Sequence, residues 1–284
     1  MKLALNGATT MRASLVEDVE AASAAGFEYL EIWATKLRKF LKTQTTAELK
    51  SLFAEKQLKP YSINSIEHVT FRDAEKHLAL LDECEELCSI AAEIDCPYVV
   101  VVPGPLPLGV KRDEVIEESV RVLTELSLIA AHYNVGLAFE FLGQSSCSVQ
   151  TLSLADEIVK QVAQANVGLV IDSFHFYAGG SKIESINALD PERLFIFHIN
   201  DAEDLPREQL EDRHRLLPGL GILPLVEITR ALERIGYKRV VSIEIFRPEY
   251  WERDPFELAR DAKAATMRVL GLCEESGNQV EAGA

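Results

Sequence analysis

Four short apolar segments in the second half of the chain each end in a side chain that can bind a metal ion. A carboxylate buried at the end of an apolar strand costs several kcal/mol unless it is paired or bound to a cation. One such ending is ordinary, but four of them, spaced 32, 26 and 46 residues apart, indicate a shared purpose. They predict neighbouring strands of one parallel barrel whose carboxyl ends converge on a divalent metal. The segments are Gly136–Glu140, Val167–Asp172, Leu194–His198 and Val240–Glu244.

The types of these ligands indicate which metal would bind. Three carboxylates and one imidazole form an oxygen-rich donor set, which favours Mn²⁺, Mg²⁺ or Co²⁺ over a structural zinc that would recruit thiolates. We expect one divalent ion, with Mn²⁺ preferred and Mg²⁺, Co²⁺ or Zn²⁺ as alternatives. The expected ligands are Glu140, Asp172, His198 and Glu244.

Four protein ligands leave one or two coordination positions for a substrate, and a carbonyl with its adjacent hydroxyl would fit them. The metal would polarise the carbonyl and stabilise the enediolate that forms when a proton leaves the neighbouring carbon. Glu140 and Glu244 are the candidates for the catalytic acid and base, from opposite sides of the site. Either glutamate taken alone could instead pair with a nearby Arg or Lys.

Further polar residues follow the expected strands. His175 lies three residues after Asp172, where it could bind a substrate oxygen or merely cap a loop. Arg215 and Arg247 could each clamp substrate hydroxyls, and surface ion pairing is equally open for both. Substrate choice would be set on the loops after the strands by residues such as Trp33, Asn64 and Phe174.

Strand and helix patterns alternate eight times along the chain, which predicts a parallel sheet with helices outside it. Eight units match an α/β (β/α)8 TIM barrel of one domain over 1–273, followed by a flexible tail over 274–284. An open, doubly wound sheet is the alternative, although 6–10 holds one glycine where nucleotide-binding sheets use several. The expected strands are 2–6, 29–33, 60–66, 98–102, 136–141, 167–173, 194–199 and 239–245, and the expected helices 14–25, 46–55, 73–94, 111–132, 152–163, 181–189, 225–235 and 256–272.

Composition narrows the class of protein. The net charge of −16 over 284 residues argues against nucleic acid as a partner, because phosphate binding needs clustered Lys and Arg. No apolar run approaches the ~20 residues of a membrane span, and the N-terminus lacks the layout of a signal peptide. We therefore expect a cytoplasmic protein with reduced cysteines. Cys84 and Cys88 lie one helical turn apart, so a zinc half-site is conceivable beside the simpler reading of buried thiols.

The motifs around the four ligands resemble those of the xylose-isomerase-like TIM-barrel superfamily of sugar isomerases and epimerases. They read Glu140-Phe-Leu-Gly, Val-Ile-Asp172-Ser-Phe-His175, Phe-His198-Ile-Asn-Asp201 and Ser-Ile-Glu244-Ile-Phe-Arg247-Pro-Glu-Tyr. In that family the matching four residues bind the metal, and the two glutamates serve as acid and base.

The opening Leu-Asn-Gly-Ala-Thr-Thr and the Phe-Arg-Pro-Glu-Tyr segment are most similar to the inosose isomerase branch, from bacterial myo-inositol catabolism. This resemblance implies a cyclic keto-polyol as substrate, interconverted through an enediol. It also allows a homo-oligomer, since many relatives are dimers or tetramers.

Other members of the superfamily supply the alternatives. Dehydratases of inosose or 3-dehydroshikimate share the four ligands. Ketohexose 3-epimerases carry a further glutamate and an Asn-Arg pair where this chain has 141–146. Asp212-Arg-His214 resembles a zinc motif of the endonuclease IV branch. That branch needs histidines at the ends of strands three and four, where this chain has Asn64 and Val102-Pro-Gly104, with only His68 nearby. A barrel that only binds a sugar is the non-enzymatic alternative.

Overall fold

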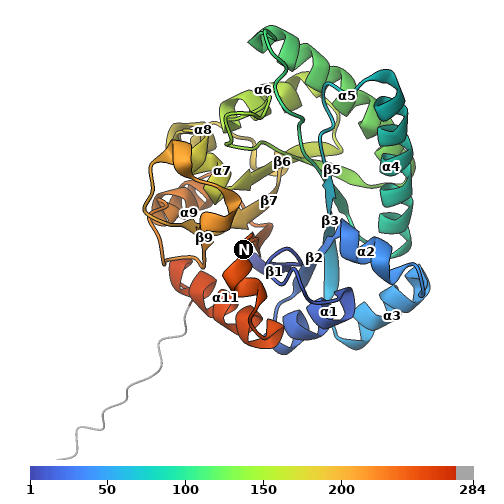
Figure 1. The fold of residues 1–284 in the computed structure, drawn as a ribbon, viewed down its shortest axis with the longest axis vertical. Helices are drawn as coiled ribbons and strands as arrows, with labels where there is room; N and C mark the ends of the chain where they lie inside the picture. Colours follow the sequence, from blue (N-terminus) through green and yellow to red (C-terminus); the bar gives the residue numbers. More distant parts are fainter. Residues whose placement is uncertain (273–284) are drawn as a thin grey trace, which may run out of the picture.

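The computed structural model describes residues 1–272, in which eight parallel strands close into a barrel (Figure 1). The predicted fold class is confirmed. Neighbouring strands follow the chain around the barrel, and β1 closes it against the last strand. The strands are β1 (Lys2–Asn6), β2 (Tyr29–Trp33), β3 (Lys59–Ile66), β4 (Tyr98–Val101), β5 (Gly136–Glu140), β6 (Val167–Asp172), β7 (Leu194–Ile199) and β10 (Val240–Ile243).

Helices surround the barrel and cover its outer face (Figure 1). Each contributes buried apolar side chains to one hydrophobic core shared with the strands, as the alternation of strand and helix patterns predicts. The covering helices are α1 (Leu15–Ala24), α3 (Thr46–Glu55), α4 (Ala74–Glu93), α5 (Arg112–His132), α6 (Leu152–Val162), α8 (Ile183–Asn187), α9 (Leu225–Arg234) and α11 (Pro255–Val269).

Several short elements on the loops were not predicted. The helices α2 (Ala34–Phe40) and α10 (Pro248–Trp251) start after residues that make no side-chain cap, and α10 spans only four residues, with Pro248 at its first position. The helix α7 (Ser173–Ala178) begins where we expected a turn. A small antiparallel pair joins β8 (Asp201–Ala202) to β9 (Arg215–Leu216).

Two smaller points concern boundaries. Thr45, the residue before the expected helix 46–55, caps α3 by accepting a hydrogen bond from the backbone N–H of Glu48. The expected flexible tail, 274–284, lies outside the described residues.

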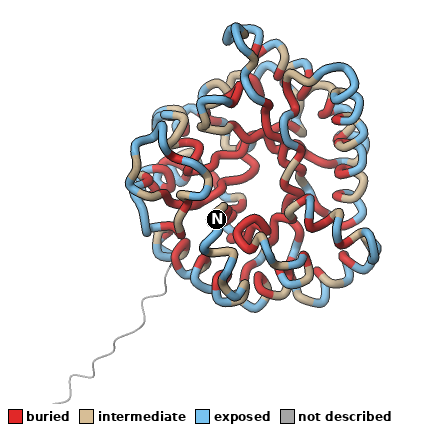
Figure 2. Tube along the Cα trace, viewed as in Figure 1, coloured by how far each residue is buried: buried red, intermediate tan, exposed pale blue. Residues whose placement is uncertain are grey.

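Inward-facing side chains alternate along the strands and stack in layers. Ala138, Val170 and Ile196 form part of an apolar cluster inside the barrel. The residues two positions further along the same strands are Glu140, Asp172 and His198, which therefore share the inward face one layer nearer the carboxyl ends. Figure 2 shows buried positions concentrated along the strands.

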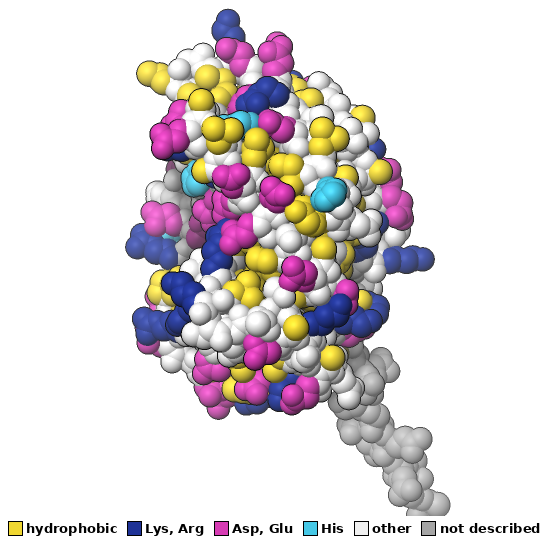
Figure 3. Space-filling view, turned by 90° about the vertical axis from the view of Figure 1, so that its right-hand side faces the viewer, with side chains coloured by type: hydrophobic (Ala, Val, Ile, Leu, Met, Phe, Trp, Pro, Cys, Tyr) yellow, Lys and Arg dark blue, Asp and Glu magenta, His cyan; other side chains and the backbone are white. Residues whose placement is uncertain are grey.

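The surface is mixed in character. On the face drawn in Figure 3, acidic and basic side chains are interspersed, although acidic residues are in excess over the whole chain. Within residues 1–272, none of the helices is both long enough and apolar enough to span a bilayer. Cys84 and Cys88 on α4 are buried free thiols with their sulfur atoms 3.9 Å apart.

Candidate metal centre and its cavity

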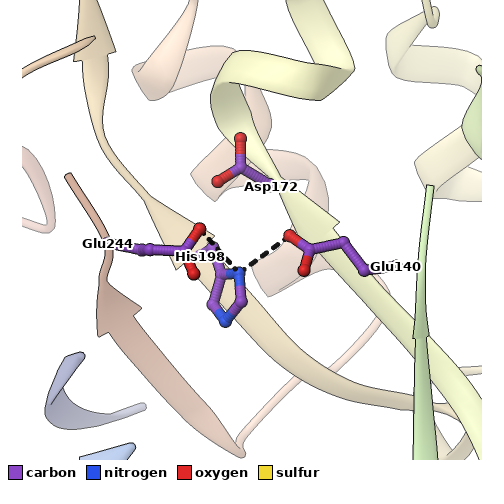
Figure 4. A group of neighbouring side chains, drawn as sticks. All are labelled: Glu140, Asp172, His198 and Glu244. Carbon is purple, nitrogen blue, oxygen red and sulfur yellow. Dashed lines mark hydrogen bonds and ion pairs between the residues drawn. The ribbon is translucent and has the colours of Figure 1, made fainter. Parts of the chain in front are cut away.

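The four strand-end ligands meet at the carboxyl end of the barrel (Figure 4). Glu140, Asp172, His198 and Glu244 each offer one ligand atom, and these atoms lie within 4.8 Å of one another. All four side chains are buried. They come from three successive strands, β5, β6 and β7, and from the residue that follows β10. The structure thus brings together the set that the apolar segments predict.

His198 stands at the centre of this cluster. Its Nδ1 lies 2.9 Å from Oε1 of Glu140 and 3.4 Å from Oε2 of Glu244, so the two glutamates approach one nitrogen from opposite sides (Figure 4). Burial alone would lower the pKa of His198, but the three glutamates around it, Glu244, Glu31 and Glu140, raise that pKa well above its ordinary value.

Glu244 is held by two amides. Asn64 and Asn6 donate to its Oε1 at 2.7 Å and 3.1 Å. Burial is the main cause that raises the pKa of Glu244 to about 8, and the nearby Glu140 adds to it while His198 and Arg215 oppose it. Burial and the nearby negative charge disfavour the ionised form of Glu244, and a bound divalent cation would stabilise that form.

Arg215 is a buried cation beside the ligands. Its Nη1 lies 2.8 Å from Oδ2 of Asp172 and 3.0 Å from Oε2 of Glu244, and its Nη2 lies 3.0 Å from Oδ1 of Asp212. Burial disfavours the charged guanidinium, but these carboxylates outweigh it and raise the pKa of Arg215 above its usual range. The guanidinium lies between the rings of Phe174 and Phe246, 5.0 Å from each centroid.

His175 is placed by the short helix α7. Asp172 caps this helix, because its Oδ1 accepts the backbone N–H of His175 at 2.9 Å. The Nε2 of His175 lies 3.0 Å from Nη2 of Arg215, which can only donate, so Nε2 accepts and Nδ1 carries the proton. Burial and Arg215 lower the pKa of His175, which favours this neutral form. Its buried Nδ1 has no hydrogen-bond partner among the described residues.

Close backbone packing fixes α7 in this position. A side chain at Gly143, on the loop after β5, would come within 2.4 Å of the carbonyl oxygen of His175. Only glycine allows this approach of the loop to the helix.

A cavity of about 300 Å³ opens above the cluster. Its polar wall includes Glu140, Glu244 and other side chains capable of binding hydroxyl groups. The remaining lining residues are Trp33, Asn64, Ser65, Glu67, His68, Val102, Pro103, Leu142, Gln144, His175, Asp212, Arg215 and Phe246.

Four of the six residues expected around the substrate line this cavity: Trp33, Asn64, His175 and Arg215. Arg247 is not among the described residues that line it. Its Nη1 donates to Glu203 at 2.7 Å and to the carbonyl oxygen of Arg215 at 3.4 Å. Arg247 therefore contacts the backbone of β9 at Arg215 and does not face the cavity. Phe174 likewise acts through Arg215, whose guanidinium it covers.

The sequence reasoning missed several residues of the site. Glu31 lies on β2, fully buried, with Oε1 2.9 Å from Nε2 of His198. Gln144 donates to Asp212 at 2.8 Å across the cavity, joining the loop after β5 to the segment before β9. Glu31 had one detectable feature, an acidic residue between Leu30 and Ile32 in a strand that must be buried on both faces. Gln144 had none.

Comparison with known proteins identifies the family of this chain. A model of the family described as xylose isomerase-like TIM barrel matches residues 19–268. The chain belongs to this family. The resemblance seen in the ligand motifs is therefore confirmed, and the match covers the barrel from its first helix to its last.

Within the family, curated relatives span nearly the whole chain. It is 39% identical to inosose isomerases of Bacillus velezensis and Bacillus subtilis over 272 residues, which cover 95% of this chain and 97–98% of those proteins. A solved structure described as IOLI protein with a bound zinc atom has a TM-score of 0.93 and 39% identity, over 95% of this chain and 98% of the other.

The donor set fits a divalent cation. Three carboxylates and one imidazole are buried around one point, and Glu31 adds a further acid behind the imidazole. Carboxylates outnumber the two cationic groups, His198 and Arg215, so the cluster lacks the positive charge that such burial requires. A divalent ion supplies that charge, and the arrangement of oxygen and nitrogen donors suits it.

Proposed function

We propose that this protein is a divalent-metal-dependent isomerase of inosose, a cyclic keto-polyol. The observation that carries the proposal is the buried ligand cluster at the floor of a cavity, in a chain that matches curated inosose isomerases over 95% of its length. The metal would be held by Glu140, Asp172, His198 and Glu244.

The reaction moves a carbonyl group to the neighbouring carbon of the ring. A base removes the proton from the hydroxyl-bearing carbon beside the carbonyl, and the electron pair left behind forms an enediolate. The hydroxyl proton then moves to the former carbonyl oxygen, and a proton returned to the former carbonyl carbon leaves the new carbonyl group on the neighbouring carbon. A cation held by Glu140, Asp172, His198 and Glu244 would supply the positive charge that polarises the carbonyl group.

Glu140 and Glu244 are proposed as the acid and base. They stand on opposite sides of His198, so each can reach one face of a ring seated between them (Figure 4). Their order is open, because neither has a contact that assigns it to removal rather than return of the proton. Both residues line the cavity directly.

Three further residues would hold the substrate. His175 carries a buried Nδ1–H without a partner, which can donate to a substrate oxygen. Asn64 donates to Glu244 through one amide hydrogen and keeps its other hydrogen and its carbonyl oxygen. Trp33 adds an apolar ring to the lining of the same cavity.

Arg215 has a different role in this proposal. Its guanidinium already contacts Asp172, Glu244, Asp212 and His175, so it positions ligand and substrate groups more than it clamps hydroxyls itself. We propose Mn²⁺ as the natural metal, on the oxygen-rich donor set, and a neutral sugar-like substrate, with no part for nucleic acid. A cytoplasmic location and a homo-oligomer belong to the same proposal.

The test is a side-by-side assay of the metal-loaded protein with 2-keto-myo-inositol and with 3-dehydroshikimate. We expect a second keto-inositol of unchanged mass from the first substrate and no dehydration of the second. Loss of water from either compound would instead indicate a dehydratase. A relative of that class, the 3-dehydroshikimate dehydratase of Pseudomonas aeruginosa, is 26% identical over 84% of this chain and 37% of its own length.

A further inference from the structure

We propose that Glu31 is a positioning residue for His198, holding the proton on Nε2 so that the lone pair of Nδ1 faces the metal. The inference rests on the proposed metal site and adds a residue to it that binds neither metal nor substrate. Glu31 comes from β2, on the opposite side of the barrel from β6. It is fully buried, as is His198.

The two ring nitrogens of His198 face different carboxylates. Nε2 lies 2.9 Å from Oε1 of Glu31, and Nδ1 lies 2.9 Å from Oε1 of Glu140. The Nδ1 edge faces the ligand cluster, and the other edge of the ring points away from it (Figure 4). Nδ1 is therefore the nitrogen able to bind a cation shared with Glu140 and Glu244.

Each ring nitrogen of His198 faces a carboxylate oxygen at 2.9 Å, and Nδ1 forms a hydrogen bond with Oε1 of Glu140. A carboxylate oxygen can only accept, so the metal-free imidazole is favoured with a proton on both nitrogens. When a cation takes the place of the proton on Nδ1, the remaining proton stays on Nε2, beside Glu31. Nε2 has no hydrogen-bond partner among the described residues, so its contact with Glu31 acts through attraction between charges. Metal-binding histidines commonly place their second nitrogen against a carboxylate, which fixes the ring and raises its basicity.

Glu31 is itself fixed by neighbours. The hydroxyl group of Ser62 donates to its Oε2, and the amide of Asn6 donates to its Oε1 at 3.3 Å. Asn6 also donates to Oε1 of Glu244 at 3.1 Å. One buried network therefore joins the carboxylate behind the imidazole to a second proposed ligand.

A purely structural role makes a different prediction. If Glu31 only satisfied buried groups, its replacement would lower stability and leave the metal site unchanged. If it positions His198, Glu31→Gln should weaken metal binding in folded protein, because the neutral amide attracts the Nε2 proton less. Loss of such a partner typically costs about 10–100-fold in metal affinity. Asp18→Asn is the matched control, since Asp18 is also a fully buried acid in an ion pair but contacts Lys36.

The experiment uses the full chain and Zn²⁺. Chelator competition gives the Zn²⁺ dissociation constant of the unaltered protein, Glu31→Gln and Asp18→Asn, with circular dichroism as the check of folding. Nitrogen-15 NMR of the zinc-loaded, histidine-labelled protein reports which ring nitrogen of His198 carries the proton. We expect Nε2–H with zinc on Nδ1, a dissociation constant raised about 10–100-fold by Glu31→Gln, and no change with Asp18→Asn.

Two results would overturn the proposal: a proton on Nδ1 with zinc on Nε2, or unchanged zinc affinity in folded Glu31→Gln. The NMR measurement is made on the unaltered protein, so it decides even if the variant does not fold. Neither readout depends on turnover. Failure of the isomerase assay with intact zinc binding would thus count against the proposed function and leave the role of Glu31 standing.

Discussion

Arg215 lines the cavity and forms an ion pair with the buried Asp172, with Nη1 2.8 Å from Oδ2. The same nitrogen lies 3.0 Å from Oε2 of Glu244, so one buried guanidinium holds two proposed metal ligands. This arrangement neutralises part of the acidic cluster and keeps both carboxylates close to their places in the site. Loss of this guanidinium would therefore affect both the ligand cluster and the free energy of unfolding of the protein.

Removal of this guanidinium should destabilise the protein. We expect Arg215→Met to lower the free energy of unfolding of the metal-free protein by about 3–5 kcal/mol, because it leaves buried carboxylates unpaired. Saturating Mn²⁺ or Zn²⁺ should restore part of the loss, since a bound cation stabilises only the folded state. Urea denaturation with and without metal measures both effects. Arg247→Met is the control, with a partly exposed ion pair and an expected cost of about 1 kcal/mol or less. Equal costs for the two variants would contradict this account.

The two glutamates of the cluster should be needed for turnover. Glu140→Gln and Glu244→Gln keep the size of the side chain but remove a group able to exchange protons, and we expect each to lower kcat by about 10²–10⁴-fold. Steady-state kinetics at saturating metal makes the measurement, with circular dichroism to show that the barrel persists. Glu203→Gln, which alters the acid paired with Arg247, should retain near-normal rates. Near-normal rates in both cluster variants would make the acid–base assignment wrong.

The metal-free protein should lose stability as the pH rises. Glu244 has a pKa of about 8 in the folded protein against an ordinary value of 4.5, so the folded state holds its proton more tightly than the unfolded chain. Its contribution to stability is full below pH ~4.5 and is lost as the pH rises through 8. His198, whose pKa is also raised, acts with the same sign.

Urea denaturation of the chelator-treated protein between pH 5 and 8.5 measures this loss. A one-proton difference between the states gives a slope of up to about 1.4 kcal/mol per pH unit. Glu244→Gln should flatten the curve, because the variant has no proton to lose at that position. The same slope in both proteins would show that Glu244 is ionised in the folded state throughout this range.

A second buried ion pair holds the loop between β1 and α1. The Nζ of Lys36 lies 2.7 Å from Oδ2 of Asp18 and also donates to the carbonyl oxygens of Gly7 and Thr10. Lys36→Met should cost about 3–5 kcal/mol, because Asp18 would be left buried and unpaired. Thermal and urea denaturation measure the change, with the exposed Lys39→Met as control. A cost below 1 kcal/mol would mean that water replaces the lysine.

The ligand cluster could be predicted because its chemistry interrupts strongly apolar strands. Phe139 before Glu140 and Phe197 before His198 mark buried strands, so the polar residue that follows needs a reason to be there. Parallel strands place such endings together, and the pattern therefore predicts both the barrel and the site. Glu31 was missed because it lies inside its strand, between Leu30 and Ile32, and not at the strand's end, where the ligand pattern was recognised.

The rest depended on tertiary contacts that local sequence does not encode. Nothing in the local sequence distinguishes the roles of Arg215 and Arg247. Arg215 forms ion pairs within the ligand cluster, whereas Arg247 contacts the carbonyl oxygen of Arg215 in β9. The proximity of Gln144 to Asp212 arises from two loops that are far apart in the chain. The short helix α7 starts at Ser173, directly after β6, so Asp172 is both the last residue of the strand and the cap of the helix, with no linker to mark the change.

Proton NMR of the metal-loaded protein with 2-keto-myo-inositol in D₂O tests the central claim most directly. An isomerase acting through an enediolate should introduce deuterium at the carbon beside the carbonyl and produce a second keto-inositol, and Glu140→Gln and Glu244→Gln should slow both events. Removal of the metal should stop them. Full turnover without deuterium uptake, or exchange that continues after the metal is removed, would contradict the account.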